Sequence, residues 1–129
     1  MDNQSILEFA REFHKIDFYR NIPFWQILSS FERNSDKLII IKDRIFRGGA
    51  IYLKLSDNMI RNIFTGEKTI EDMDDLIKDN GDNIHFIFVK ADSLRIILKG
   101  LRTVIKNENP KTISWFKPDL SFRFINFRR

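Results

Sequence analysis

Apolar residues recur along the chain at two spacings, and each change of spacing marks a change of secondary structure. Spacings of three and four residues predict helices, whereas runs or alternations of Ile, Val and Phe predict strands. The predicted order is helix, helix, strand, strand, helix, strand, helix, strand, strand, with a short helix before the central strand. The first helix is predicted to begin at Ser5, and the others are predicted to cover 23–31, 57–64, about 70–78 and 94–106. The strands cover 38–41, 45–55, 84–91, 112–116 and 122–127.

Segment 84–106 is the centre of this pattern. Its first part is an almost unbroken apolar run, which predicts a strand covered on both faces and central in a sheet. Asp92 and Ser93 then provide an N-cap signal. The apolar residues at helical spacing predict the sheet-facing stripe of the helix that follows: Leu94, Ile97, Leu98, Leu101, Val104 and Ile105. Because a capped helix N-terminus leaves free N–H groups, this corner is a candidate phosphate site.

Local signals define the other elements. Ser5 opens a capping-box spacing, Pro23 suits the first turn of the second helix, and Trp25 is predicted to join the core. Gly48-Gly49 indicates a bulge or a close backbone approach within its strand. Beyond the glycines the strand alternates, which places Tyr52 on a partly open face.

Strand pairs that alternate with helices around a central buried strand are typical of a mixed sheet with helices on both faces. We therefore expect an α+β (three-layer) fold with about five strands. The length of 129 residues suits a single domain, with an N-terminal helix in 1–17 and a core in 18–129.

Composition excludes several kinds of chemistry. The chain has no cysteine and only His14 and His85, which excludes disulfides, thiolate chemistry and a histidine-rich metal site, so no metal is expected. No signal peptide and no apolar run long enough to span a bilayer are recognised, so we expect a cytoplasmic protein without membrane contact.

Charge is unevenly distributed. Acidic residues dominate 56–83, and basic residues dominate from Ser93 onward. The helix predicted in that basic part carries Arg95, Lys99, Arg102 and Lys106 on one face. This face suits an acidic protein or, less well, a nucleic acid, and a solvated helix face is the alternative. Only Phe122, Phe124 and Phe127, beside Arg123, Arg128 and Arg129, hint at an RNA-binding surface.

Several short segments carry a resemblance to a known family. They are Tyr19-Arg20-Asn21-Ile22-Pro23, KLIIIKDRIFRGGAIYLKLS, DNGDNIHFIFVKAD and NPKTISWF. In order and spacing the chain resembles GNAT-type N-acyltransferases from about Phe18 to its end. It looks most like RTX-toxin-activating lysine acyltransferases and their phage-encoded relatives. The resemblance implies acyl-coenzyme A or acyl carrier protein as co-substrate, and a phage or prophage origin.

The chain departs from that family at the positions that matter for chemistry. The family's catalytic His falls on Tyr19, and its catalytic Asp falls on Phe88. The glycine-rich coenzyme A loop of ordinary GNAT enzymes is also absent. The fold therefore carries over better than the mechanism, and no tightly bound cofactor is expected.

The candidate site residues follow from the resemblance and from the strand order. The candidates for proton transfer or oxyanion contact are Tyr19, Tyr52 and His85. The candidates for donor binding are Phe88, Val89, Ala91, Asp92, Ser93 and Arg95. The candidates for partner binding are Arg95, Lys99, Arg102 and Lys106.

Two functions remain open. The first is a divergent N-acyltransferase that moves an acyl group from acyl-coenzyme A or acyl carrier protein to an amine. The second is a catalytically silent GNAT-like domain that binds an acidic protein or nucleic acid through its basic helix face. Homodimer formation is compatible with both.

Overall fold

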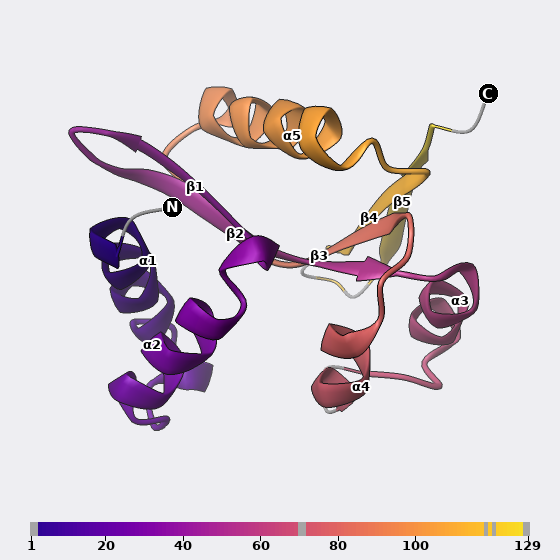
Figure 1. Ribbon diagram of the computed structural model, residues 1–129, viewed down its shortest axis with the longest axis horizontal. Helices are drawn as coiled ribbons and strands as arrows, with labels where there is room; N and C mark the ends of the chain where they lie inside the picture. Colours follow the sequence, from indigo (N-terminus) through magenta and orange to yellow (C-terminus); the bar gives the residue numbers. More distant parts are fainter. Residues whose placement is uncertain (1–2, 70–71, 118, 120, 128–129) are drawn as a thin grey trace. The chain divides into compact units, whose positions relative to one another are not determined.

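The computed structural model describes residues 3–69, 72–117, 119 and 121–127 (Figure 1). The first half of the chain forms α1 (Asn3–His14), η1 (Asp17–Tyr19), α2 (Phe24–Arg33), η2 (Ser35–Lys37), β1 (Leu38–Asp43) and β2 (Ile45–Leu55). The second half forms α3 (Asp57–Thr65), α4 (Met73–Lys78), β3 (Asn83–Ala91), α5 (Leu94–Glu108), β4 (Thr112–Phe116) and β5 (Phe122–Asn126).

The strands form one mixed sheet in the order β1-β2-β3-β4-β5. β3 pairs with β4 in parallel, and β4 pairs with β5 in antiparallel orientation. β3 is therefore the third of five strands, which confirms that the apolar run beginning at Ile84 is central. The predicted α+β class with about five strands is confirmed as well.

The chain divides into two compact units. The first contains the described residues up to Ala50 together with Val89–Leu101. The second contains Ile51–Phe88 and the described residues from Arg102 onward. No helix in the described parts of the chain is long and apolar enough to cross a membrane.

The first unit is built around Phe9 of α1, which is fully buried. Its ring lies 5.3 Å from that of Phe31 in α2 and 5.8 Å from that of Phe46 in β2, so α1 and α2 pack side by side beneath the sheet (Figure 1). A Cβ atom on Gly49 would lie 2.9 Å from Phe9 Cε1, whereas one on Gly48 would lie 2.7 Å from Ile96 Cγ2 in α5. Because consecutive strand residues face opposite sides, these glycines admit a helix on each face. The predicted close backbone approach is confirmed.

The second unit has its core on the face of β2 that carries Leu53 and Leu55. These side chains pack with Ile63 of α3 and Leu76 of α4. The other face of the same strand carries Tyr52, whose hydroxyl donates to Glu108 Oε2 in α5 over 2.9 Å. Helices therefore cover both faces in this unit too, as predicted.

Some local predictions are wrong. Ser5 is buried within α1, which begins earlier, so it does not cap that helix. Trp25 is 69% exposed rather than part of the core, because α2 turns Ile27 and Phe31 inward instead. The chain bends at Arg44 between β1 and β2, and this residue adopts a left-handed φ of 66°. Of the predicted helix 70–78, residues 70–71 lie outside the described residues.

Candidate functional site

The rotation of α5 differs from the prediction. Three apolar side chains expected to face the sheet point outward: Leu94, Ile97 and Leu98 are 69%, 44% and 42% exposed. The sheet-facing side of the same helix holds Ile96, Gly100 and Val104. Gly48 leaves room for Ile96, and a Cβ atom on Gly100 would meet Ile39 at 3.7 Å. The close contact of Gly48 with Ile96 therefore sets the rotation of the helix, and this leaves Leu94, Ile97 and Leu98 exposed.

The four basic side chains of α5 are exposed, as predicted: Arg95, Lys99, Arg102 and Lys106. At 100° per residue they form a row beside the outward apolar stripe. Within the described chain, Arg95, Arg102 and Lys106 take part in no ion pair. The only acidic residue of the helix is Glu108, whose carboxylate lies 3.5 Å from Lys54 Nζ. The outward face is therefore apolar and cationic, without a carboxylate.

The start of α5 is less suited to a phosphate than the sequence implied. Ser93 caps the helix: its Oγ accepts from the N–H of Ile96 over 3.4 Å. The Asp92 carboxylate does not cap the helix but lies 3.4 Å from Arg47 Nη1. It remains a negative charge beside the helix N-terminus, where it would repel a phosphate.

β3 is buried only at its beginning. Asn83, Ile84 and His85 are buried, Phe88 and Ala91 are half-buried, and Val89 is exposed. The prediction of cover on both faces along the whole strand is therefore wrong for its second half. The parallel pairing with β4 runs from Asn83↔Thr112 to Phe86↔Trp115, and β3 continues beyond its last paired residue.

Tyr19 ends η1 and packs against α1. Its ring stacks on that of Phe13 with a centroid distance of 4.1 Å. Burial raises the pKa of the Tyr19 phenol above its ordinary value of 10.0. The phenol is therefore protonated at neutral pH, so it can donate a hydrogen bond but is a poor proton acceptor.

Tyr52 is 3% exposed, so the prediction that it lies on a partly open face is wrong. The reason is that α5 covers this face of β2: the Tyr52 hydroxyl donates to Glu108, and its ring meets Phe86 edge-on at 5.9 Å. Buried and already hydrogen-bonded, Tyr52 supports packing of α5 rather than contact with a substrate.

His85 lies in a buried aromatic setting. Its Nδ1 is 2.9 Å from Ser114 Oγ on the neighbouring strand, where the two residues are register partners. Its ring is parallel to that of Phe122 and perpendicular to that of Phe116. Burial lowers the pKa of the imidazole to about 4, so it is neutral at pH 7.

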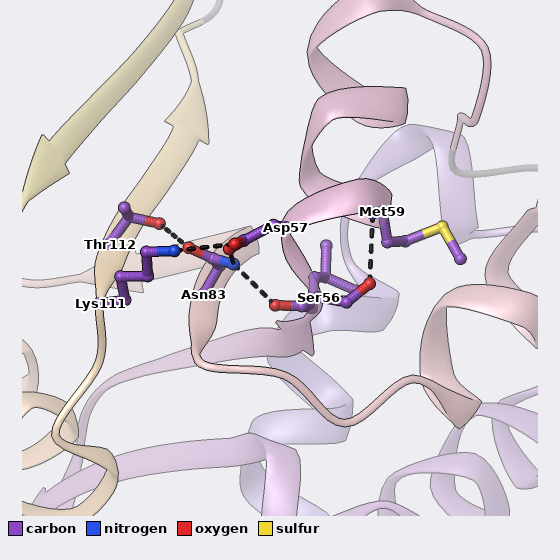
Figure 2. A network of polar contacts seen from close by, with 7 residues as sticks. Ser56, Asp57, Met59, Asn83, Lys111 and Thr112 are labelled. Atoms are coloured by element: carbon purple, nitrogen blue, oxygen red, sulfur yellow. Dashed lines mark hydrogen bonds and ion pairs between the residues drawn. The ribbon is translucent and has the colours of Figure 1, made fainter.

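A polar network around the buried side chain of Asn83, at the start of β3, has no counterpart in the sequence prediction. Figure 2 shows Asn83 between the start of β4 and the first turn of α3. Its amide Nδ2 donates to the Leu55 carbonyl over 3.0 Å and to Asp57 Oδ1 over 2.9 Å, and its Oδ1 accepts from Thr112 Oγ1 over 2.7 Å. Lys111 Nζ lies 2.8 Å from Asp57 Oδ2. One side chain thus joins β2, α3, β3 and β4.

The second unit also carries an exposed aromatic patch, formed by Phe64, Phe116, Phe122 and Phe124. The Phe122 ring is its centre, with centroid distances of 5.0 Å to Phe64, 5.3 Å to Phe116 and 6.3 Å to Phe124. Phe64, Phe116 and Phe124 are largely exposed. Arg123 alternates to the opposite face of β5, so it does not flank this patch as an RNA-binding surface would require. Arg128 and Arg129 lie outside the described residues.

The candidate residues thus fall into separate groups. Tyr52, His85 and Phe88 belong to the second unit, whereas Tyr19, Val89, Ala91, Asp92, Ser93 and Arg95 belong to the first. Among the described residues, no group of three or more His, Asp and Glu side chains is placed to hold a metal ion. No protein-family model matches the chain, and no curated protein is significantly similar to it in sequence.

Proposed function

We propose that this protein is a docking domain with a GNAT-like fold, in which the outward face of α5 binds an acidic protein. The α5 docking surface consists of Leu94, Arg95, Ile97, Leu98 and Lys99. The observation that carries the proposal is the exposure of three large apolar side chains beside a row of cations. The same helical spacing continues the cations to Arg102 and Lys106.

Each part of this surface has a physical role in binding. Fully burying a Leu or Ile side chain is worth about 1.5–3 kcal/mol, so the apolar stripe can supply affinity. The neighbouring cations attract an acidic partner over a range set by salt, and so they raise the association rate. A partner with apolar side chains framed by carboxylates matches both parts.

A protein fits this surface better than a nucleic acid. Single-stranded nucleic acids are bound by stacking of bases on aromatic rings, and the α5 docking surface contains only aliphatic side chains. Duplexes are bound mainly through phosphates, which leaves three exposed aliphatic side chains without a function. The family resemblance implies one acidic protein as a partner, namely acyl carrier protein.

The environment of the tyrosines and His85 also favours docking over catalysis. Tyr52 is committed to Glu108, Tyr19 packs on Phe13, and His85 is enclosed by phenyl rings. A general base needs a pKa near the working pH and access to the substrate. None of these three side chains combines the two properties.

We expect polar substitution of the stripe to reduce binding of acyl carrier protein in the apo form. Ile97→Ser/Leu98→Ser should weaken the affinity at least about tenfold, because buried aliphatic area is lost. Arg95→Glu/Lys99→Glu should weaken binding mainly at low salt and flatten its salt dependence. Isothermal titration calorimetry at low and high salt measures both effects.

Arg33→Glu, at the exposed end of α2, is the matched control and should bind like the wild type. All these variants should retain the fold, because surface changes usually alter stability by less than about 0.5 kcal/mol. If both double variants bind with the affinity of the wild type, α5 is not part of the interface. If the wild type binds a single-stranded oligonucleotide and the same variants do not, the partner of α5 is a nucleic acid and not a protein.

A second candidate function is acyl transfer to an amine, and the topology of the sheet favours it. A parallel β3–β4 pair lies within a mixed sheet, and β3 extends beyond the last paired residue, Phe86. An extended acyl donor can pair with strand backbone beyond the β4 pairing as a peptide strand does. Phe88 and Val89 are the residues of β3 implied in donor binding. We place both candidate functions in the cytoplasm.

Under this second candidate, Tyr19 is the oxyanion donor. Turnover with a panel of acyl-coenzyme A and acyl-carrier donors should fall about 10²–10³-fold in Tyr19→Phe, because one donor to the developing charge is lost. Product formation is followed by mass spectrometry, with Tyr52→Phe as the control for a tyrosine hydroxyl in a structural role. Unchanged turnover would remove Tyr19 from the reaction. A complete lack of turnover with every donor would leave docking as the function.

A further inference from the structure

The outer edge of β5 is the feature that the docking function does not use. β5 is the last strand of the sheet, and no described strand pairs with its outer side. Four of its five residues are exposed, including Phe124 at 60% and Ile125. Exposed strand edges with apolar side chains are templates for pairing with another chain.

The hydrogen bonds to β4 show which backbone groups face that edge. The Lys117 N–H donates to the Ser121 carbonyl over 2.9 Å, and the Phe127 N–H donates to the Lys111 carbonyl over 2.9 Å. Hydrogen-bonded pairs alternate in an antiparallel ladder, so the odd-numbered residues of β5 bond to β4. Phe122 and Phe124 therefore direct their backbone N–H and C=O groups outward.

The opposite edge of the sheet is better protected. β1 exposes only its last two residues, Lys42 and Asp43, and its apolar residues are buried or half-buried. Charged residues on an edge discourage pairing with other strands. Of the two edge strands, β5 is therefore the one better suited to pair with a partner strand.

We propose that β5 pairs with β5 of a second copy of this chain, antiparallel about a twofold axis at Phe124. Such a contact is isologous, so it closes as a dimer instead of growing into a fibre. In this register the two Phe124 residues form a hydrogen-bonded pair. The whole strand is matched, and the two sheets become one.

Side-chain charge selects this register. Arg123 lies opposite the second copy's Ile125, so its aliphatic stem covers an exposed apolar side chain. A shift that centres the axis on Arg123 would place two guanidinium groups directly opposite each other, which is unfavourable. The axis at Phe124 also joins the two aromatic patches, because the Phe124 rings lie on the same face as Phe116 and Phe122.

The main test is Phe124→Pro. Proline at this position removes an outward N–H but no bond to β4, so β5 should keep its place in the sheet. Sedimentation equilibrium should show wild-type protein at twice the chain mass of 15.5 kDa at high concentration. Phe124→Pro should weaken dimerisation at least about tenfold, because the reciprocal pair of hydrogen bonds is lost. Phe124→Ala, which keeps the N–H, should weaken it less.

A cross-linking variant tests the register in this cysteine-free chain. Arg123 and Ile125 form non-hydrogen-bonded pairs across the proposed axis, where Cα atoms are about 4.5 Å apart and a disulfide fits. Arg123→Cys/Ile125→Cys should therefore form covalent dimers on mild oxidation, whereas Asp74→Cys/Lys78→Cys on the exposed side of α4 should not.

Three outcomes would overturn the proposal. Wild-type protein that remains monomeric at every concentration would leave the edge to solvent or to a strand of another protein. A dimer unaffected by Phe124→Pro would use a different surface. A dimer that is lost in Arg95→Glu/Lys99→Glu but kept in Phe124→Pro would place the contact on α5.

Discussion

Replacing Asn83 by Ala should lower the free energy of unfolding by about 3 kcal/mol. Its buried side chain hydrogen-bonds to the buried Leu55 carbonyl, the half-buried Thr112 hydroxyl and the exposed Asp57 carboxylate. Deleting it leaves the buried Leu55 carbonyl without this donor, which costs about 1–3 kcal/mol, and it also removes the hydrogen bonds to Thr112 and Asp57. The loss should appear as a lower midpoint in urea unfolding followed by circular dichroism.

Asn58→Ala is the matched control, because Asn58 is exposed on α3 and alanine is a good helix former; its stability should stay close to that of the wild type. A double-mutant cycle with Thr112→Val should give a coupling energy of about 1 kcal/mol between the two side chains. A loss in Asn83→Ala no larger than in Asn58→Ala would show that water replaces the network.

Acidification should destabilise the protein through His85. The folded-state pKa of this imidazole is about 4 against 6.5 for the free side chain, so the unfolded chain binds the proton more readily. Stability from this group is fully present above pH 6.5 and is lost as the pH falls toward 4. Because one pKa unit corresponds to 1.36 kcal/mol, the total is about 3 kcal/mol.

The measurement is the urea midpoint at several pH values from 7 down to 4, compared between wild type and His85→Gln. Glutamine keeps a polar partner for Ser114 but does not titrate, so the pH dependence of this variant should be smaller by the His85 contribution. Parallel profiles for wild type and His85→Gln would mean that His85 has an ordinary pKa in the folded protein.

The strand pattern was the most predictable part of the fold. The bounds of β2 and β4 agree with the prediction from apolar alternation. Ser56 and Asp57 are both capping residues by type, and the structure shows Ser56 in that role, since its hydroxyl accepts from the Met59 N–H. These features depend on residues close together in the sequence. Local propensity and capping chemistry are therefore enough to define them.

The candidate site was less predictable, because it depends on contacts between distant segments. The stripe at Leu94 and Leu98 has good helical spacing, yet the contact between Ile96 and Gly48 decides which side of α5 faces the sheet. Asn83 resembles any polar residue in a turn until β4 brings Thr112 beside it. A signal was available in Gly48, since a glycine in a strand allows close approach of a helix to the sheet.

Because of the contact between Gly48 and Ile96, a substitution at Gly48 can change which side of α5 faces outward. A side chain at Gly48 would meet Ile96 and the Lys90 carbonyl, and α5 would have to turn or lift to avoid it. Such a change would turn different side chains of α5 outward, although Gly48 itself is buried. A substitution at this one position in the middle of a strand can therefore change the outward side of α5 while every residue of the α5 docking surface stays the same.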